Sequence, residues 1–270
     1  MKKKLIITLV IILVLLTIIL VYNKSYKSHH IIVKEYSIVD KVIPEKYHGL
    51  KIVQYSDILY GKSANLTDIK NMVKKINETN PDIVVFTGDF FSKDVKISTK
   101  ELNKIKIELS KITVKYDKFA VIGDNDLTFK DAFYQLFNDE YKILDNEHYL
   151  FYLNSDIPIR ITGINDVTKE EQLSEEDNKL FNILLIHKPD DLTSLKNNYN
   201  LAFAGHSIGG QIKLPFFGPL IKLKGAKTYV SGKYQVGNTT LFVNDGIGSQ
   251  NFNMRIGNNP KINFYRLYAK

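Results

Sequence analysis

Cysteine is absent from this sequence of 270 residues. The absence excludes a disulfide framework, a thiolate zinc site and a cysteine nucleophile, and it fits either side of a membrane. Beyond residue 30 the sequence also lacks Pro/Gly-rich linkers, low-complexity stretches and internal repeats. Because 44% of the residues are hydrophobic, the chain can bury a sizeable core, and we assign one large domain to residues 31–270.

No dense run of basic residues accompanies the net charge of +8. A basic protein can attract nucleic acid, anionic lipid or phosphorylated substrates. Since no basic groove is apparent, we interpret most of this charge as a solvated surface and do not expect a nucleic-acid partner.

The longest uncharged stretch covers residues 5–22 and follows a short basic tail, residues 1–4. At roughly 1.5 Å per residue, a helix of this length reaches about 27 Å, close to the hydrocarbon thickness of a bilayer. A cleaved signal peptide is the alternative, but no A-x-A pattern comes after the stretch. We therefore predict an uncleaved transmembrane anchor, a tether over residues 23–30 and a single-pass protein of the cell membrane with the lipid bilayer as a partner.

The lysines around this stretch indicate its orientation. Lys2, Lys3 and Lys4 favour a cytoplasmic N-terminus, whereas Lys24 and Lys27 on the other flank weaken the asymmetry. On balance we expect the domain to lie outside the cytoplasm.

Apolar runs alternate with helical patterns along the rest of the chain. Several runs are continuous, as in strands covered on both faces, while residues 66–76 and 102–112 repeat apolar residues at helical spacing. Gly237-Asn238 separates two further runs, as in a β-hairpin. The pattern predicts an α/β sandwich with helices outside, sheets inside and some antiparallel strands. The expected strands are Ile31–Val39, Leu50–Ser56, Asp82–Thr87, Phe119–Ile122, Ile159–Gly163, Asn182–Ile186, Leu201–Ala204, Thr228–Val236, Thr239–Asn244 and Lys261–Tyr268.

Five of the expected strands end in polar residues that can bind a metal. In sheet-centred α/β folds, the loops at the carboxyl ends of strands converge on one crevice. Carboxylates and imidazoles in such a crevice are suitable ligands for a divalent ion. Each residue alone has an ordinary explanation in a turn or a hydrogen bond, but together they predict a metal site. These residues are Asp57, Asp89, Asp124, His187 and His206.

The same motifs carry a resemblance to a known family. In order and spacing they resemble the calcineurin-like metallophosphoesterases, above all the membrane-associated bacterial branch, over roughly residues 45–268. The resemblance implies a metallophosphoesterase β-sandwich flanked by helices, bound Mn, Fe or Zn, and hydrolysis of phosphate esters. The matching segments are Lys51-Ile52-Val53-Gln54, Asp57, Asn80-Pro81-Asp82, Thr87-Gly88-Asp89, Gly123-Asp124-Asn125-Asp126, His187, Gly205–Gln211 and Gly246-Ile247-Gly248.

The sequence departs from the family pattern at three histidines. Leu59 stands in place of the histidine of the D-x-H motif, and Ile208 replaces the last histidine of the G-H-x-H motif. The resemblance implies that both losses fall in the first of two metal pockets, which keeps Asp57 and Asp89. The residues that match the second pocket can all coordinate a metal: Asp89, Asp124, His187 and His206.

The third departure is Asn125, which stands where the family has its catalytic histidine. Asparagine can donate a hydrogen bond but cannot transfer a proton at neutral pH, so a catalytic role for Asn125 is in doubt. Leu59 and Ile208 offer no lone pair and make the first pocket drier. Asp124 adds a carboxylate where the family has asparagine. We therefore expect an altered site that holds one divalent ion or two, with a surplus of negative charge.

Two functions remain open. The first is a membrane-anchored enzyme that hydrolyses a lipid-linked or surface phosphate ester with an altered, single-metal site. The second is a catalytically inactive binding or scaffold protein of the same fold at the membrane surface. Two bound metals would favour the enzyme, and none would favour the scaffold.

A last apolar group, Phe216, Phe217 and Leu220, lies between the fifth motif and the expected hairpin. It could touch lipid or substrate, but we expect a satellite core cluster.

Overall fold

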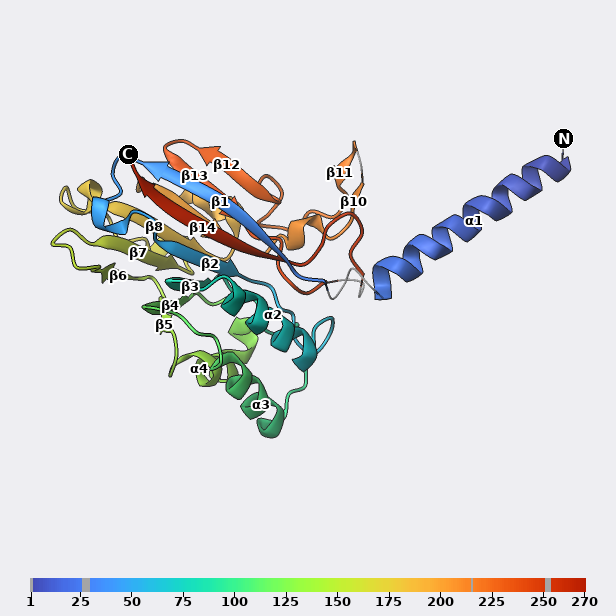
Figure 1. Cartoon of the computed structure of the whole chain (residues 1–270), viewed down its shortest axis with the longest axis horizontal. Helices are drawn as coiled ribbons and strands as arrows, with labels where there is room; N and C mark the ends of the chain where they lie inside the picture. Colours follow the sequence, from blue (N-terminus) through green and yellow to red (C-terminus); the bar gives the residue numbers. More distant parts are fainter. Residues whose placement is uncertain (1, 26–29, 215, 251–253) are drawn as a thin grey trace.

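The computed structural model describes residues 2–25, 30–214, 216–250 and 254–270. Within these ranges two six-stranded sheets pack face to face, and three helices cover the outer face of the first sheet (Figure 1). The helices are α2 (Leu66–Glu78), α3 (Thr99–Leu109) and α4 (Lys130–Phe137).

The first sheet has the order β1-β14-β2-β3-β4-β5, and the second has the order β12-β13-β9-β8-β7-β6. A short pair, β10-β11, stands apart from both. The bounds are β1 Ile32–Asp40, β2 Lys51–Tyr55, β3 Ile83–Phe86, β4 Asp117–Ala120, β5 Lys142–Ile143, β6 Glu147–Phe151, β7 Ile159–Ile164, β8 Phe181–Ile186, β9 Leu201–Ala204, β10 Lys213–Leu214, β11 Gly218–Pro219, β12 Gly232–Val236, β13 Thr239–Val243 and β14 Lys261–Ala269.

The core lies in layers on the two faces of the first sheet. Phe86 belongs to the cluster beneath the helices, where Ile105 of α3 also lies. Val85, the residue before Phe86 in β3, points to the opposite face and packs in the same cluster as Phe203 of β9, between the sheets. Every residue of β3 and β8 is buried, because both sheets are covered on both sides near the middle.

Helix α2 illustrates how local sequence sets these elements. Met72 and Ile76 lie one turn apart and are fully buried against the sheet. At the N-terminus, Asn65 accepts a hydrogen bond from the backbone N–H of Thr67, and the carboxylate of Asp68 accepts one from the backbone N–H of Asn65. The apolar stripe and the capped start together fix the helix on the sheet.

The strand directions bring the motif segments to one edge. β2, β3 and β4 are parallel neighbours, and so are β7, β8 and β9. Parallel neighbours end at the same edge of a sheet, so the segments after them converge. Gly88 and Gly123 permit this approach, since a Cβ on Gly88 would lie 2.8 Å from the Cα of Gly123.

The α/β sandwich expected from the sequence is confirmed, and each expected strand has a counterpart. The strand expected at Thr228–Val236 is shorter, because β12 begins only at Gly232. Helix α4 and strand β6 were not predicted from the sequence. β6 is an edge strand with largely exposed side chains, and α4 has only 8 residues, so neither carries a long apolar pattern.

Helix α1 (Lys2–Ser25) projects away from the sandwich in Figure 1 and carries exposed apolar side chains such as Leu5 and Leu13. In the described part of the chain, no helix is both long and apolar enough to cross a membrane. The structure thus contains a helix over residues 5–22 but gives no support to the transmembrane anchor predicted there. Of the tether predicted at residues 23–30, residues 23–25 belong to α1 and residues 26–29 lie outside the described residues.

Candidate metal centre

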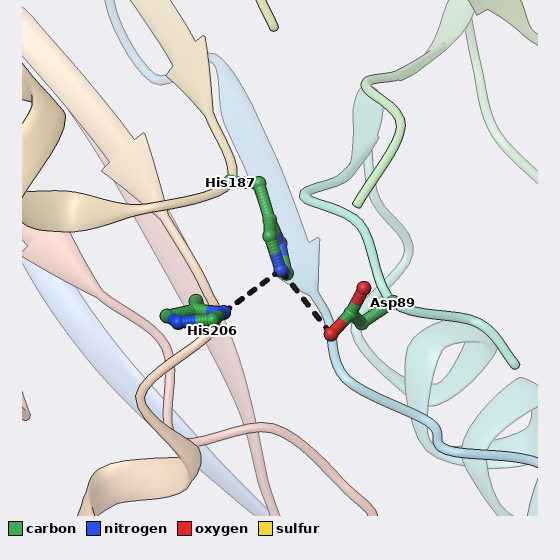
Figure 2. A group of neighbouring side chains, drawn as sticks. All are labelled: Asp89, His187 and His206. Carbon is green, nitrogen blue, oxygen red and sulfur yellow. Dashed lines mark hydrogen bonds and ion pairs between the residues drawn. The ribbon is translucent and has the colours of Figure 1, made fainter. Parts of the chain in front are cut away.

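Three of the predicted ligands come together in the fold. Asp89 follows β3, His187 follows β8 and His206 follows β9, and their side chains converge in Figure 2. Nε2 of His187 lies 3.3 Å from Oδ2 of Asp89 and 3.1 Å from Nδ1 of His206. One ligand atom from each residue lies within 4.8 Å of the others, and all three residues are buried.

Backbone carbonyls hold the two imidazoles of this triad. Nδ1 of His187 lies 2.8 Å from the carbonyl oxygen of Thr87, and Nε2 of His206 lies 2.8 Å from that of Lys224. A carbonyl can only accept a hydrogen bond, so these two nitrogens carry the N–H groups. The opposite nitrogens, Nε2 of His187 and Nδ1 of His206, face each other, and Nε2 of His187 also faces Asp89. A proton on Nε2 of His187 bridges these partners, and a bound metal ion would replace it. This arrangement, with each outer N–H bound to an acceptor, is typical of histidines that bind a metal.

Asn125, the predicted catalytic residue, contacts the third ligand. Its backbone N–H donates to Oδ1 of Asp89 at 2.8 Å, and its side-chain amide donates to Oδ2 at 3.0 Å. The side chain therefore orients the Asp89 carboxylate.

Asp124 is a predicted ligand that lies outside this group. Its carboxylate is 2.8 Å from the ammonium of Lys188, and its side chain is 43% exposed. The triad of Asp89, His187 and His206 is thus formed without it.

Asp57 lies beside the triad in a fully enclosed position. Its two oxygens accept the backbone N–H of His206 at 3.1 and 2.9 Å, and the hydroxyl of Ser56 donates to Oδ2. A Cβ on Gly205 would lie 2.7 Å from the same Oδ2, so that position needs glycine. Asp57 therefore ties the end of β2 to the histidine loop after β9.

The positions of the two missing histidines are occupied by buried aliphatic side chains. Leu59 and Ile208 are each only 2% exposed. Both have a positive φ, 53° for Leu59 and 52° for Ile208, which is uncommon for any non-glycine residue and especially for a β-branched one. Such backbone strain costs of order 1–3 kcal/mol per residue and is found mostly at functional sites. The loops thus keep a strained backbone at positions without a ligand.

The burial of these groups shifts their pKa values. Burial alone would lower the pKa of His187, but the neighbouring Asp89 and Asp57 carboxylates raise it to about 10. Burial and the neighbouring His187 lower the pKa of His206. Burial raises the pKa of Asp57 to about 7, whereas contact with His187 holds the pKa of Asp89 below its usual range despite burial. The cluster therefore favours a bound positive charge between Asp89 and the imidazoles.

Asp126 is a structural residue of the site to which the sequence assigned no role. Its fully buried carboxylate accepts the backbone N–H groups of Phe90, Phe91 and Gly123 at 2.8, 3.1 and 3.2 Å. It therefore locks the loop that carries Asp89 onto the loop that carries Asn125. The only signal in the sequence was a third polar residue in the same Gly-Asp-Asn-Asp motif.

A cavity of about 660 Å³ opens beside His206. Two lysines, Lys188 and Lys224, line it together with three aspartates, Asp124, Asp190 and Asp191. Burial works against a charged Lys188, but contact with Asp124 raises the pKa of this lysine above its ordinary value. The cavity therefore offers a fixed ammonium group close to the candidate metal ligands.

Comparisons with known proteins identify the family of the chain. The calcineurin-like phosphoesterase family matches residues 50–222. The metallophosphoesterase YkuE of Bacillus subtilis, itself uncharacterized, is 32% identical over 91% of this chain and 88% of its own length. The UDP-2,3-diacylglucosamine pyrophosphatase LpxG of Chlamydia trachomatis is 26% identical over 64% of this chain and 69% of its own. The phosphodiesterase YaeI of Escherichia coli is 22% identical over 80% and 82%. On the breadth of the family match and the similarity to YkuE, the chain belongs to the calcineurin-like phosphoesterases.

Proposed function

We propose that this protein hydrolyses phosphate esters with an altered metal site that holds one divalent ion. The observation that carries the proposal is the convergence of one nitrogen each from His187 and His206 with a carboxylate oxygen of Asp89, all within 4.8 Å of one another, while carbonyls hold both outer N–H groups. Members of the family use divalent metals. Two nitrogen ligands and one carboxylate suit Mn²⁺, Fe²⁺ or Zn²⁺. A bound ion would supply Lewis acidity and lower the pKa of water.

The aliphatic residues support one ion over two. Leu59 and Ile208 fill the positions of two imidazoles and offer no lone pair, so the neighbouring pocket retains only carboxylate ligands. A second divalent ion there would lack the nitrogen ligands that the family pattern supplies.

Lys188 is suited to hold the phosphate of the substrate. Its ammonium lies at the wall of the cavity and is paired with Asp124 rather than buried in the triad. A phosphate oxygen that enters the cavity would exchange partners with Asp124 and bind the ammonium as a charge-assisted hydrogen bond. Part of the positive charge that a second metal would provide is thereby supplied by this side chain.

For the substrate, we propose a lipid-linked phosphodiester or pyrophosphate. One relative is named a pyrophosphatase of a diacylated sugar nucleotide, and another is named a phosphodiesterase. Location at a cell membrane, with the domain outside the cytoplasm, remains our prediction from the N-terminal sequence. Fractionation of cells, followed by protease treatment of intact cells, would test this location.

The alternative is an inactive protein that binds a phosphate ester without hydrolysing it. One observation favours this alternative: the amide of Asn125 is engaged with Asp89, and asparagine cannot transfer a proton to a leaving group. An inactive protein would bind a metal ion and still show no turnover.

Metal content and hydrolysis, measured on the same preparation, test the proposal. Full-length protein in detergent should contain about one Mn²⁺, Fe²⁺ or Zn²⁺ per chain and hydrolyse bis(p-nitrophenyl) phosphate slowly. His206→Ala should lose both the metal and the activity. His148→Ala is the matched control, because His148 pairs with Glu171 away from the triad. Metal without turnover would establish the inactive alternative, and turnover that survives in His206→Ala would contradict the proposed site.

A further inference from the structure

The β10–β11 hairpin exposes a group of large apolar side chains. Leu214, Phe216, Phe217 and Leu220, which we call the apolar tip, are 37%, 106%, 81% and 56% exposed. The expectation that Phe216, Phe217 and Leu220 form a satellite core cluster is therefore wrong. The two strands that carry the tip have only 2 residues each. A contiguous exposed group of this kind marks an interaction surface more often than chance exposure does.

The base of the hairpin is held firmly. The backbone N–H of Lys213 donates to the carbonyl of Ile256 at 2.8 Å, and that of Leu220 donates to the carbonyl of Ile212 at 2.8 Å. At the turn, Phe216 has a φ of 67°, a strained value for this residue type. The fold thus maintains a strained turn that presents two phenyl rings to the outside, and internal packing gives no reason for it.

The segment around the tip is strongly basic. Between residues 192 and 244 the sequence contains six lysines and no aspartate or glutamate. Lys213 and Lys222, on the two sides of the tip, are both exposed. An aromatic and aliphatic tip with a lysine collar is the combination that binds the surface of an anionic bilayer.

The tip is also close to the candidate site along the chain and in space. The chain continues from Leu220 to Lys224, whose carbonyl binds His206 at 2.8 Å. Leu223 and Lys224 line the 660 Å³ cavity. In Figure 1, β10 and β11 lie at the end of the molecule where β1 begins and from which α1 projects. Exposed apolar residues of α1 and of the tip are therefore found at the same end.

We propose that the apolar tip inserts into the headgroup layer of an anionic lipid bilayer and holds the cavity of Lys188 and Lys224 against the membrane surface. This contact is separate from any anchoring by α1. The tip enters to about the depth of the headgroup–acyl boundary, and the lysines contact lipid phosphates. Docking would let phosphates carried by lipids reach the cavity directly. This consequence for substrate choice rests on the proposed function, whereas the docking itself does not.

A single tryptophan can report the depth of the tip, because the sequence has none. Full-length Phe217→Trp would be mixed with vesicles of phosphatidylglycerol and phosphatidylcholine whose acyl chains are brominated near the headgroup. We expect a blue shift and a loss of at least about half of the fluorescence. The matched control is Tyr152→Trp, an exposed aromatic position directly after β6, and β6 lies at the opposite end of the molecule in Figure 1. Its emission should stay unchanged.

Three results would overturn the proposal. The first is Phe217→Trp emission unaffected by vesicles that bind the protein, and the second is equal quenching of both probes. The third is a blue shift that appears without lipid and grows with protein concentration. That result would mean that the apolar tip contacts a second copy of the chain instead of a bilayer.

The lysine collar has its own test. Lys213→Gln with Lys222→Gln, in the Phe217→Trp background, should weaken vesicle binding at least about fivefold and remove the preference for anionic over zwitterionic vesicles. An unchanged preference would contradict the role of the lysines. Because Phe217→Trp with His206→Ala should dock normally, a failure of docking can be told apart from a failure of the proposed hydrolysis.

Discussion

The loops around the candidate site carry two kinds of side chain. We call the side with Asp89, His187 and His206 the ligating half, and the side with Leu59 and Ile208 the aliphatic half. On one side, ring nitrogens of His187 and His206 face each other, and that of His187 also faces Asp89. On the other, Leu59 and Ile208 occupy equivalent family positions with aliphatic carbon, yet both keep a backbone with positive φ. The two sides therefore carry different side chains, while positive φ values occur on both, at Leu59 and Ile208 as well as at Asp89 and His206.

This difference separates two requirements of a metal site. Strained loops are a property of the backbone, set by glycines such as Gly88 and Gly205 and by buried hydrogen bonds. Ligation is a property of single side chains. A site can lose its ligating side chains and keep its strained loop backbone, since buried aliphatic groups stabilise the loops through packing instead of coordination.

The largest expected effect comes from restoring the aliphatic half. In the variant Leu59→His, Ile208→His, Asp124→Asn and Asn125→His, we expect the metal content to rise to two per chain and Mn²⁺-dependent hydrolysis of bis(p-nitrophenyl) phosphate to rise at least about a hundredfold, because a second ion and a proton donor are regained. Each single substitution should change little. A folded variant with two metals and no added activity would show that the substrate cleft, and not only the pocket, is impaired.

A substitution at Arg255 tests whether the loops of the aliphatic half contribute to the stability of the fold and not to metal binding. This buried guanidinium donates to the carbonyls of Gly248 and Asp245, and a Cβ on Gly248 would lie only 2.7 Å from Cβ of Leu59. Arg255→Met leaves these carbonyls without their charged donor, so we expect a loss of about 3 kcal/mol in the free energy of unfolding. Denaturant titration measures this loss. Metal affinity should be unchanged, and a tenfold fall would place Arg255 in the ligating half.

Asn125→Ala tests the other half. The side-chain amide orients Asp89, so its removal should weaken Mn²⁺ binding roughly tenfold, in the range found for residues that hold a metal ligand. Isothermal titration of the full-length protein gives the affinity. Asn138→Ala, at the end of α4, is the control and should have no effect. If Asn125→Ala binds Mn²⁺ normally but loses activity, Asn125 contacts the substrate instead.

The smallest effect is expected at the wall of the cavity. Lys188→Gln should raise the KM for an aryl phosphodiester about threefold to tenfold with little change in kcat, because a charge-assisted contact to phosphate is lost. Asp124→Asn should lower KM, since it frees the ammonium. The same direction of change in both variants would exclude competition between Asp124 and the phosphate for Lys188.

Strand periodicity in the sequence predicted most of the fold and the three residues of the triad. Asp89, His187 and His206 were identified because each lies within three residues of the end of a buried strand, and neighbouring parallel strands end at one edge. The partner of Asp124 was not predictable, because the ion pair with Lys188 depends on how the loops after β4 and β8 meet. The exposure of Phe217 was missed because apolar composition alone does not distinguish a core residue from an apolar residue exposed on a short hairpin.

The positive φ values of Leu59 and Ile208 bear on how this family changes over time. A loop that needs a new backbone path requires several coordinated mutations, whereas a leucine codon can become a histidine codon through one nucleotide change. Since Leu59 and Ile208 already hold the left-handed conformation, a histidine placed at either position would inherit that conformation. A change of ligand set in these two loops is therefore a matter of side-chain replacement, by one nucleotide change at a leucine codon and by two at an isoleucine codon.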